Sequence, residues 1–547
     1  MLPGGRRRGD GVRGGRCRLP CRVRAEAEAC VNHGAPAQKH YTQIRGARVR
    51  RARGARPFAA LVALPFLGCS LLDNPNPKLD VETPVSYRGA RAVPAPAPAL
   101  DWPREFRSPE LTRLSVDAQA GNFDIAAALA RIVQAQGQAE IAGAALYPTV
   151  DANASADRAG SPGTLHSKRG PFRTVASNLF SLGLTASYEL DFWGLNAANA
   201  RAGRLLLEAS RFDRDVVALM TAASVANTYF TVLGSQDRLR IARQNTQTAE
   251  RVLKAIQNRF SVGTASALDV SQEESLVDTQ RASIPPLEQT VLQSKNLIAV
   301  LVGRPPESVS IKGGSLDRIF VPHVPPGIPS QLLLRRPDIA EAEAQLAAQN
   351  ASVYAARAAF FPTIRLSGSG GVESLLLKNL FRSDAFFGQM AASATQPILD
   401  GGNLEGQFTL QKGKQVELLQ NYRKAIVQAF TDVENALIAI EETTRHEKLE
   451  AEVVAASTRA YNLTEQQLHE GTIDITTVLN TQQTLFQAED TLSQIKLQRL
   501  TAVVSLYQAL GGGFARDQYP VTADDQPATD SGTILPSGVV AAPGYQP

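Results

Sequence analysis

The stretch Leu182-Gly-Leu-Thr-Ala-Ser-Tyr-Glu-Leu-Asp-Phe192 decides the fold. Its even-numbered residues are apolar or aromatic, and its odd-numbered residues are glycine or polar. Successive side chains of a strand point to opposite faces, so this alternation predicts a strand with one apolar face and one wet face. Alternation over about ten residues is typical of strands in membrane barrels. A half-buried strand of a soluble sandwich is the alternative that the pattern leaves open.

The chain also contains an internal repeat. Two segments recur at an offset of 214 residues, and a third recurs at an offset of 208. The matched pairs are Phe123–Ala130 with Pro337–Ala344, Ala145–Val150 with Ala359–Ile364, and Phe260–Thr264 with Leu468–Thr472. A repeat of this length predicts that each copy is a structural unit with the same elements.

Each copy has the same predicted order of a helical run, two strands and a long helical hairpin. The helical runs are expected from Leu111 to about Ala145 and from Pro337 to about Phe360. The strands are expected at Tyr147–Ala156 and Leu182–Phe192 in the first copy, and at Phe361–Gly370 and Phe387–Leu399 in the second. The chain is therefore expected to supply four strands.

The hairpins are expected to be very long. Between positions 419 and 440, apolar residues recur at spacings of three and four, which is close to a heptad seam. The 69 residues from Gly402 to Glu470 would extend roughly 100 Å as one helix. Gly263 and Gly471 interrupt the helices, and each is followed by threonine, which predicts the hairpin turns there.

Four strands cannot close a membrane barrel, whose lower limit is about eight. Strand edges left unpaired in lipid are costly, so the chain must assemble with copies of itself. Three copies would supply twelve strands and leave room for a lumen. The expected function is the passage of solutes, with no chemistry at any residue.

The N-terminal region has the features of an export signal. The basic stretch Arg48–Arg56 and the apolar run Pro57–Gly68 describe a secretory signal, and the run is too short to span a membrane. Leu67-Gly68-Cys69 resembles a lipobox, which predicts that Cys69 is acylated as the mature N-terminus; an ordinary signal with an incidental cysteine is the alternative. The long arginine-rich start predicts a true initiation site downstream of Met1.

Charge and composition exclude several classes of protein. Residues 1–68 carry 15 Lys and Arg against 3 Asp and Glu, whereas the rest carries 42 against 49, so the body is mildly acidic and not a nucleic-acid binder. The six histidines show no metal-ligand spacing, and no nucleophile, base and orienting group converge. We therefore expect no enzyme activity, cofactor or metal.

The segments predicted from these features cover the whole chain. They are a leader at 1–68, a lipidated extended segment at 69–110, repeat 1 at 111–300, a Pro/Gly-rich linker at 301–334, repeat 2 at 335–513 and a disordered tail at 514–547.

Three stretches resemble the outer membrane efflux factors of the TolC-like superfamily. They are Gly327–Ala344, Ala356–Ile364 and Ala186–Gly194. Cys69, Trp102 and the Ser108-Pro-Glu-Leu111 stretch resemble the lipoprotein branch of that family, often called NodT-type. The resemblance implies a mixed α/β membrane protein: a homotrimer with a twelve-strand outer membrane β-barrel, four strands per chain, continued by a periplasmic barrel of coiled-coil helical hairpins.

The resemblance also implies partners and a site. The partners would be outer membrane lipid, a periplasmic adaptor and an inner-membrane pump of the resistance-nodulation-division class. The hairpin tips would form the periplasmic aperture and the adaptor contact, at positions that map to Gly263, Asp269, Gly471, Asp474, Thr477 and Asn480. Where the family often has aspartates in the second tip, this chain has Thr477 and Asn480, and Asp474 stands one helical turn earlier.

Helix capping is the plainer interpretation of these tip residues. Asp474 stands near an expected helix start, where a carboxylate satisfies free backbone amides and favours the helix dipole. For Asp269, a solvated helix face is the plainer interpretation, and gating or pairing between tips is the alternative. For the whole chain, a protein-secretion duct and a periplasmic coiled-coil scaffold without a pore remain the alternatives to the exit duct of an efflux pump for small toxic solutes.

Overall fold

The structure is a computed structural model that describes residues 81–88, 96, 98–162, 174–514 and 516. The chain divides into two compact units, Met1–Leu64 and Pro65–Pro547, and the described residues all belong to the second. Cys69, the expected leader and nearly all of the expected tail lie outside the described residues.

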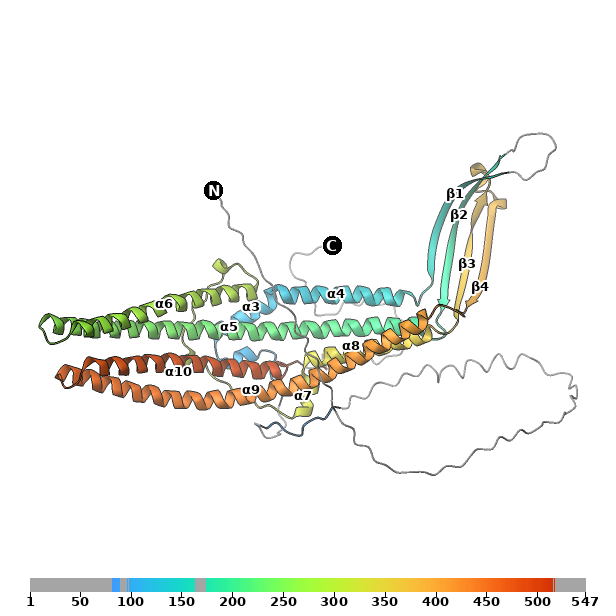
Figure 1. The fold of residues 1–547 in the computed structure, drawn as a ribbon. Coiled ribbons are helices and arrows are strands. Elements are labelled where there is room, and N and C mark those ends of the chain that lie inside the picture. Colours follow the sequence, from blue (N-terminus) through green and yellow to red (C-terminus); the bar gives the residue numbers. More distant parts are fainter. Residues whose placement is uncertain (1–80, 89–95, 97, 163–173, 515, 517–547) are drawn as a thin grey trace, which may run out of the picture. The chain divides into compact units, whose positions relative to one another are not determined.

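The two repeats contain the same series of elements (Figure 1). Repeat 1 contains α3 (Pro109–Gly121), α4 (Phe123–Ala144), β1 (Thr149–Pro162), β2 (Thr174–Leu190), α5 (Leu195–Ser261) and α6 (Ala267–Val302). Repeat 2 contains α7 (Pro329–Arg335), α8 (Pro337–Ala358), β3 (Thr363–Ser374), β4 (Phe386–Thr395), α9 (Asn403–Glu470) and α10 (Ile475–Ala509). Short 3₁₀ turns lie at Trp102–Phe106, Pro306–Ser308, Leu316–Arg318, Leu377–Asn379 and Ser383–Ala385.

The four strands form one antiparallel sheet in the order β1-β2-β3-β4. The register places Leu182 opposite Val372 and Tyr188 opposite Leu366, while the alternate positions pair Thr185 with Ser369. Directly opposed residues share a face, so one face of the sheet is apolar and the other is polar. The alternation predicted from the sequence is confirmed, and it extends across both repeats.

The predicted strands exist, but each has one end four or more residues from its predicted position. β1 ends at Pro162 rather than at Ala156, and β3 ends at Ser374 rather than at Gly370. β2 begins at Thr174, eight residues before the predicted start, because β1 continues to Pro162 and pairs with it there. β4 ends at Thr395 rather than at Leu399. Pro397 lacks the amide hydrogen that a ladder needs, which explains the early end.

The single helix predicted from Leu111 to about Ala145 is in fact two helices that meet at Asn122. Asn122 adopts an extended backbone, and its side-chain oxygen accepts hydrogen bonds from the amides of Asp124 and Ile125 at 2.8 and 3.1 Å. This is an N-cap, which starts α4 in a new direction. The predicted helix of the second repeat, by contrast, is confirmed as α8.

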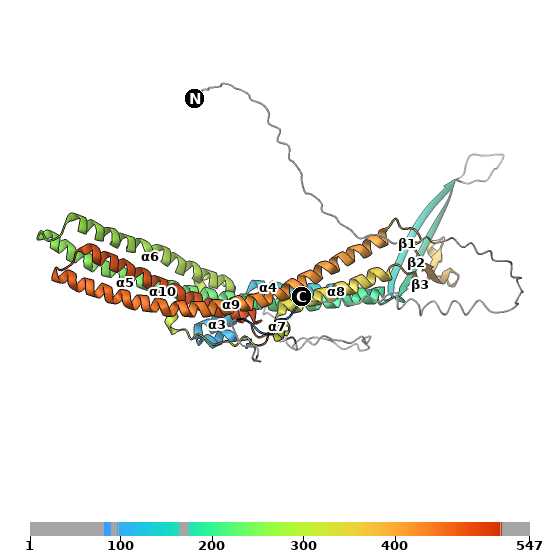
Figure 2. The ribbon, with the colours of Figure 1, turned by 60° about the horizontal axis from the view of Figure 1, so that its bottom comes forward.

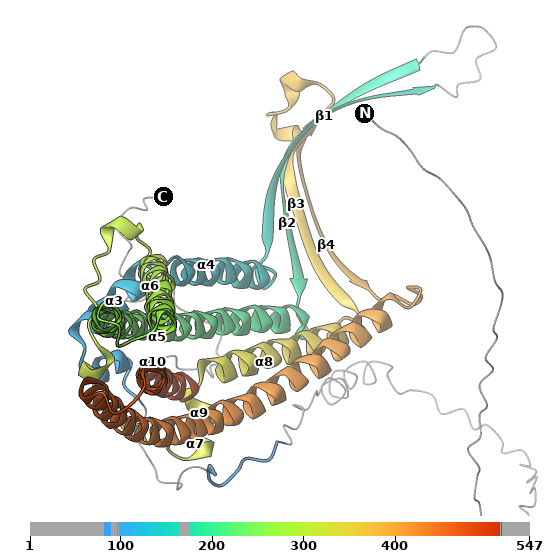
Figure 3. The same ribbon diagram turned by 60° about the vertical axis from the view of Figure 1, so that its left-hand side comes forward.

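The helical part consists of two hairpins, α5–α6 and α9–α10, that lie side by side (Figure 2). α5 packs against α4, α6, α8 and α10, whereas α9 packs mainly against α8 and α10 (Figure 3). One window of α5 is apolar enough to cross a membrane by composition, but 56% of it is buried inside the protein. We interpret it as the central core helix of the bundle.

An equivalent hydrogen bond links the beginning and the end of each repeat, and we call it the joint of that repeat. The Asn122 side chain donates to the backbone oxygen of Leu301 at 2.8 Å, and Arg336 donates to that of Ala509 at 3.2 Å. Asn122 and Arg336 are 214 residues apart and each is an N-cap, while the two carbonyls are 208 residues apart. Each repeat thus ties the start of its first long helix to the end of its last.

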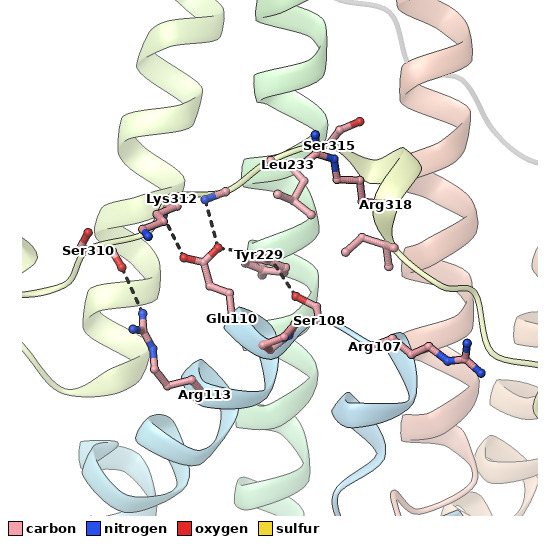
Figure 4. Close-up of a pocket in the computed structure, with 14 residues that line it drawn as sticks. Arg107, Ser108, Glu110, Arg113, Tyr229, Leu233, Ser310, Lys312, Ser315 and Arg318 are labelled. Carbon is pink, nitrogen blue, oxygen red and sulfur yellow. Dashed lines mark hydrogen bonds between the residues drawn. The ribbon is translucent and has the colours of Figure 1, made fainter.

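The segment between the repeats is fixed to the helices around a pocket of about 550 Å³ (Figure 4). The Glu110 carboxylate accepts hydrogen bonds from the amides of Lys312 and Gly313 and from the Tyr229 hydroxyl. Tyr229 in turn accepts from the Ser108 hydroxyl at 3.2 Å. These bonds join α3 and α5 to the inter-repeat segment.

Candidate functional site at the hairpin tips

The first hairpin turns between α5 and α6. Gly263 has a φ of +76° and lies exposed in the turn, where a side chain would strain the backbone. The Ser266 hydroxyl accepts from the Asp269 amide at 3.2 Å, and the Asp269 carboxylate accepts from the Ser266 amide at 2.8 Å. This reciprocal arrangement is a capping box, and it fixes the start of α6.

The second hairpin turns between α9 and α10. Gly471 has a φ of +75° and ends α9, and Asp474 is the N-cap of α10. The Asp474 carboxylate accepts from the Thr477 amide at 3.0 Å and from the Thr477 hydroxyl at 3.4 Å. Asn480 lies exposed on α10, three residues after Thr477.

The two tips exchange chemical roles at corresponding positions. Ser266 and Asp474 are 208 residues apart and are both N-caps, and Asp269 and Thr477 are 208 residues apart and both lie three residues further on. The first tip has a hydroxyl and then a carboxylate, and the second has the reverse. The capping interpretation of Asp474 is therefore confirmed. Asp269, for which a solvated helix face was expected, belongs to a capping box instead. The role of both residues in an aperture stays a prediction.

The two tips are joined to each other. The Arg259 guanidinium, in the last turn of α5, donates to the backbone oxygen of Leu468, in the last turn of α9, at 3.0 Å. Beneath this bond lies an apolar core, which we call the tip core. Its buried members are Ala249, Val252, Ile256, Leu276, Val277, Tyr461, Ile475, Val478, Leu479, Leu485 and Phe486. It draws on all four helices, so movement of one tip disturbs the packing of the other.

Two buried polar residues beside the tip core were not predicted from the sequence. Glu273 on α6 and Gln482 on α10 are each 0% exposed. Neither oxygen of Glu273, and neither polar atom of the Gln482 side chain, has a hydrogen-bond partner among the described residues. Burial raises the pKa of the Glu273 carboxyl to about 7. Helical spacing places each on the same face as apolar residues of the tip core, but the sequence does not show how deeply either is buried.

The tip residues predicted from the sequence lie close together in each hairpin. Gly263, Asp269, Gly471, Asp474 and Thr477 all lie in or directly after the turns, as predicted from the sequence, and Asn480 follows them on α10. Within the described part of the chain, no three His, Cys, Asp or Glu side chains are placed to hold a metal ion. The described tips offer exposed polar turns above a packed core.

Comparisons with known proteins agree with this architecture. Residues 114–304 and 328–512 match the model of a family described as outer membrane efflux protein. The chain is 39% identical to the pyoverdine export outer membrane protein OpmQ of Pseudomonas aeruginosa, over 78% of this chain and 90% of OpmQ. It is 28% identical to SilC of Salmonella typhimurium, described as a probable outer membrane lipoprotein, over 76% of this chain and 88% of SilC.

A solved structure shows the same arrangement of elements. The open state of the MtrE outer membrane channel of Neisseria gonorrhoeae superimposes with a TM-score of 0.72 at 29% identity. The superposition covers 81% of this chain and 98% of MtrE. The fold class predicted from the sequence is therefore confirmed.

Proposed function

This chain belongs to the outer membrane efflux protein family, and on that premise we propose that three copies of it assemble into the exit channel of a tripartite efflux pump. The chain is an outer membrane efflux channel, and its relatives are transport proteins rather than enzymes. The trimer, the docking partners, the tip residues and the solutes that pass are the proposed part.

The two open edges of the sheet carry the proposal of a trimer. β1 and β4 each pair on one side only, although the sheet has an apolar face suited to lipid. An open edge in the hydrocarbon layer leaves backbone amides and carbonyls unpaired, and each costs several kcal/mol. Pairing β4 of one copy with β1 of the next removes every edge once the ring closes. Three copies give twelve strands, which exceeds the lower limit for a barrel.

The helices support the same closure. α9 carries four apolar side chains at a regular spacing of eleven residues, which we call the α9 stripe: Val416, Val427, Ile438 and Leu449. They are 55, 54, 48 and 50% exposed, and the spacing places them on one face of the helix. At the opposite edge of the chain, α4 exposes Phe123, Val133 and Ile141. An edge-to-edge contact of this kind is heterologous, and it generates a ring when the rotation between successive copies closes.

The tips support docking with a periplasmic adaptor and, through it, an inner-membrane pump of the resistance-nodulation-division class. They are the ends of the helical hairpins away from the sheet (Figure 1), so in a chain whose sheet lies in the outer membrane they face the periplasm. In this proposal the six tip residues named above form the aperture and the adaptor contact. MtrE has been solved in an open state, which supports a closable aperture in this chain.

Two further features belong to the proposal. We infer that Cys69 is acylated and anchors the mature protein in the outer membrane, a role consistent with the similarity to the lipoprotein SilC. We also infer that the segments 1–68, 69–110, 111–300, 301–334, 335–513 and 514–547 act as leader, anchor segment, repeat 1, linker, repeat 2 and tail. The similarity to OpmQ favours small exported solutes over a secreted protein.

The experiment is deletion of the gene followed by complementation. A strain that lacks the channel should accumulate a small toxic solute, and the wild-type gene should restore export. A gene whose product carries Val427→Asp on the α9 stripe should not restore it, whereas Lys448→Ala on the exposed surface of the same helix should. Full export with Val427→Asp would contradict the proposed assembly. Unchanged sensitivity to a broad panel of solutes, in a strain without a second such channel, would contradict efflux.

A further inference from the structure

Glu273 is a carboxyl group held where water cannot reach it. It lies on α6, three and four residues before Leu276 and Val277 of the tip core, so it shares their face of the helix. Its side chain is 0% exposed and neither oxygen has a partner among the described residues. An ionised carboxylate without a partner is among the most costly groups to bury, and a protonated carboxyl costs far less.

Gln482 on α10 is a second buried polar side chain without a hydrogen-bond partner among the described residues. It lies three and four residues from the core residues Leu479, Val478, Leu485 and Phe486, and it is likewise 0% exposed. Its amide carries no charge, so it cannot compensate a carboxylate. The two unpaired groups come from different hairpins, α5–α6 and α9–α10. The packing of the two hairpins around Glu273 is therefore stable only while the Glu273 carboxyl is neutral.

The groups that face this part of the core offer no cation to Glu273. Tyr461 on α9 is near enough to respond to its charge, and burial, followed by the carboxylate of Glu465, raises the Tyr461 pKa. Arg251 on α5 acts on Tyr461 in the opposite direction. The members of the tip core on α10 are apolar. Burial is the cause that holds the proton on Glu273.

We propose that Glu273 is a proton-dependent latch of the periplasmic aperture, which holds the two hairpins together while protonated and loosens them when it ionises. The proposal rests on the proposed function, because the latch has a role only if the tips close a channel. The latch would make closure of the aperture depend on pH, which the helix caps at the tips do not. The caps fix the start of each helix, whereas the latch acts on the packing between hairpins.

The direction of the pH effect follows from the two states of the group. Burial raises the Glu273 pKa from 4.5 to about 7, so the packed tips bind more protons than loosened tips between these two values. Packing is most stable below the lower value and loses stability as the pH rises towards about 7. Above that value the carboxyl is ionised in both states and the loss is complete. The aperture should therefore open more readily as the pH rises.

The test is the conductance of the full-length protein in planar bilayers, recorded from about pH 5 to about pH 8. Wild-type conductance should rise from about pH 5 to about pH 7 and stay constant at higher pH. Glu273→Gln keeps the shape and removes the ionisation, so its conductance should stay at the low-pH level throughout. Glu274→Gln is the matched control, because Glu274 is the exposed neighbour on the same helix, and it should titrate like the wild type.

The outcomes separate the latch from the channel. A wild-type conductance that does not change with pH, or a Glu273→Gln channel that still titrates, overturns the latch and leaves the proposed function standing. Absence of conductance at every pH contradicts the proposed function itself. An infrared titration decides independently of conductance. Burial raises the pKa of Glu341 to about 7 as well, so the wild type is compared with Glu273→Gln. A carboxylic acid that loses its proton near pH 7 should be present in the wild type and missing from the variant, and identical titrations of the two proteins overturn the latch.

Discussion

α5 and α9 occupy the same place in their repeats and have nearly the same length, 67 and 68 residues, yet their surroundings differ. Twenty-five residues of α5 are buried, against six of α9. α5 packs against helices on both sides, whereas α9 forms an edge of the chain. Repetition in the sequence fixes the length of a helix but not its environment. The exposed apolar side chains of α9 indicate a surface that contacts a second copy of the chain.

The largest effect is expected from a charge placed inside α5. Val225 is 0% exposed in the core that joins α3, α5, α6 and α10, so Val225→Asp would bury an unpaired carboxylate. We expect a loss of about 4 kcal/mol in the free energy of unfolding, or failure to fold. Thermal unfolding followed by circular dichroism measures it. A melting temperature equal to that of the wild type would contradict the central position assigned to α5.

The same substitution on α9 should act on assembly and not on the chain. Val427 is 54% exposed, so Val427→Asp should change the stability of the folded chain by less than about 0.5 kcal/mol. It should nevertheless prevent the chains from associating. Light scattering of the detergent-solubilised protein measures this, with Lys448→Ala as control. A Val427→Asp protein that associates like the wild type would show that the α9 stripe faces no partner.

The two joints should also differ in strength. Arg336 pairs with Asp338 and Asp432 and has a side chain only 11% exposed. Removing one partner of a buried pair costs about 3 kcal/mol, so Arg336→Ala should destabilise more than Asn122→Ala, which loses a cap worth about 1 kcal/mol and one further bond. Arg104→Ala removes an exposed ion pair with Asp101 and serves as control. Denaturant unfolding gives the order, and equal losses for both joints would contradict the difference in burial.

The smallest effects are expected at the tips. Ser266→Ala and Asp474→Ala should each loosen the first turn of the following helix by about 1 kcal/mol. Amide hydrogen exchange at the start of α6 and α10 measures this directly. Asn480→Ala should leave both helix starts unchanged, because Asn480 lies beyond the first turn. Equal loosening by Asn480→Ala would mean that the caps do not control the turns.

The strands and hairpin turns could be predicted because their causes are local. The alternation of apolar and polar residues predicts a sheet with two different faces. Gly263 and Gly471 predict turns that need a positive φ. The break at Asn122 was missed, although asparagine is a preferred N-cap and follows Gly121 here. Its equivalent in the repeat, Arg336, directly precedes a proline, and aligning the two positions would have exposed the break.

Burial of polar residues could not be predicted, because its cause lies in other helices. Glu273 and Gln482 look like surface residues of amphipathic helices, and only the packing of the two hairpins against each other encloses them. Arg336 is similar, since Asp432 reaches it from a helix about a hundred positions further along the chain. Periodicity shows which face of a helix is apolar but not how deeply a polar neighbour is buried beside that face.

The central claim is that one chain supplies a third of a closed wall. The most direct test is the mass of the purified wild-type complex, measured by native mass spectrometry from detergent. We predict a single species that contains three chains. A single chain, or a distribution of sizes without a closed ring of three, would contradict the account.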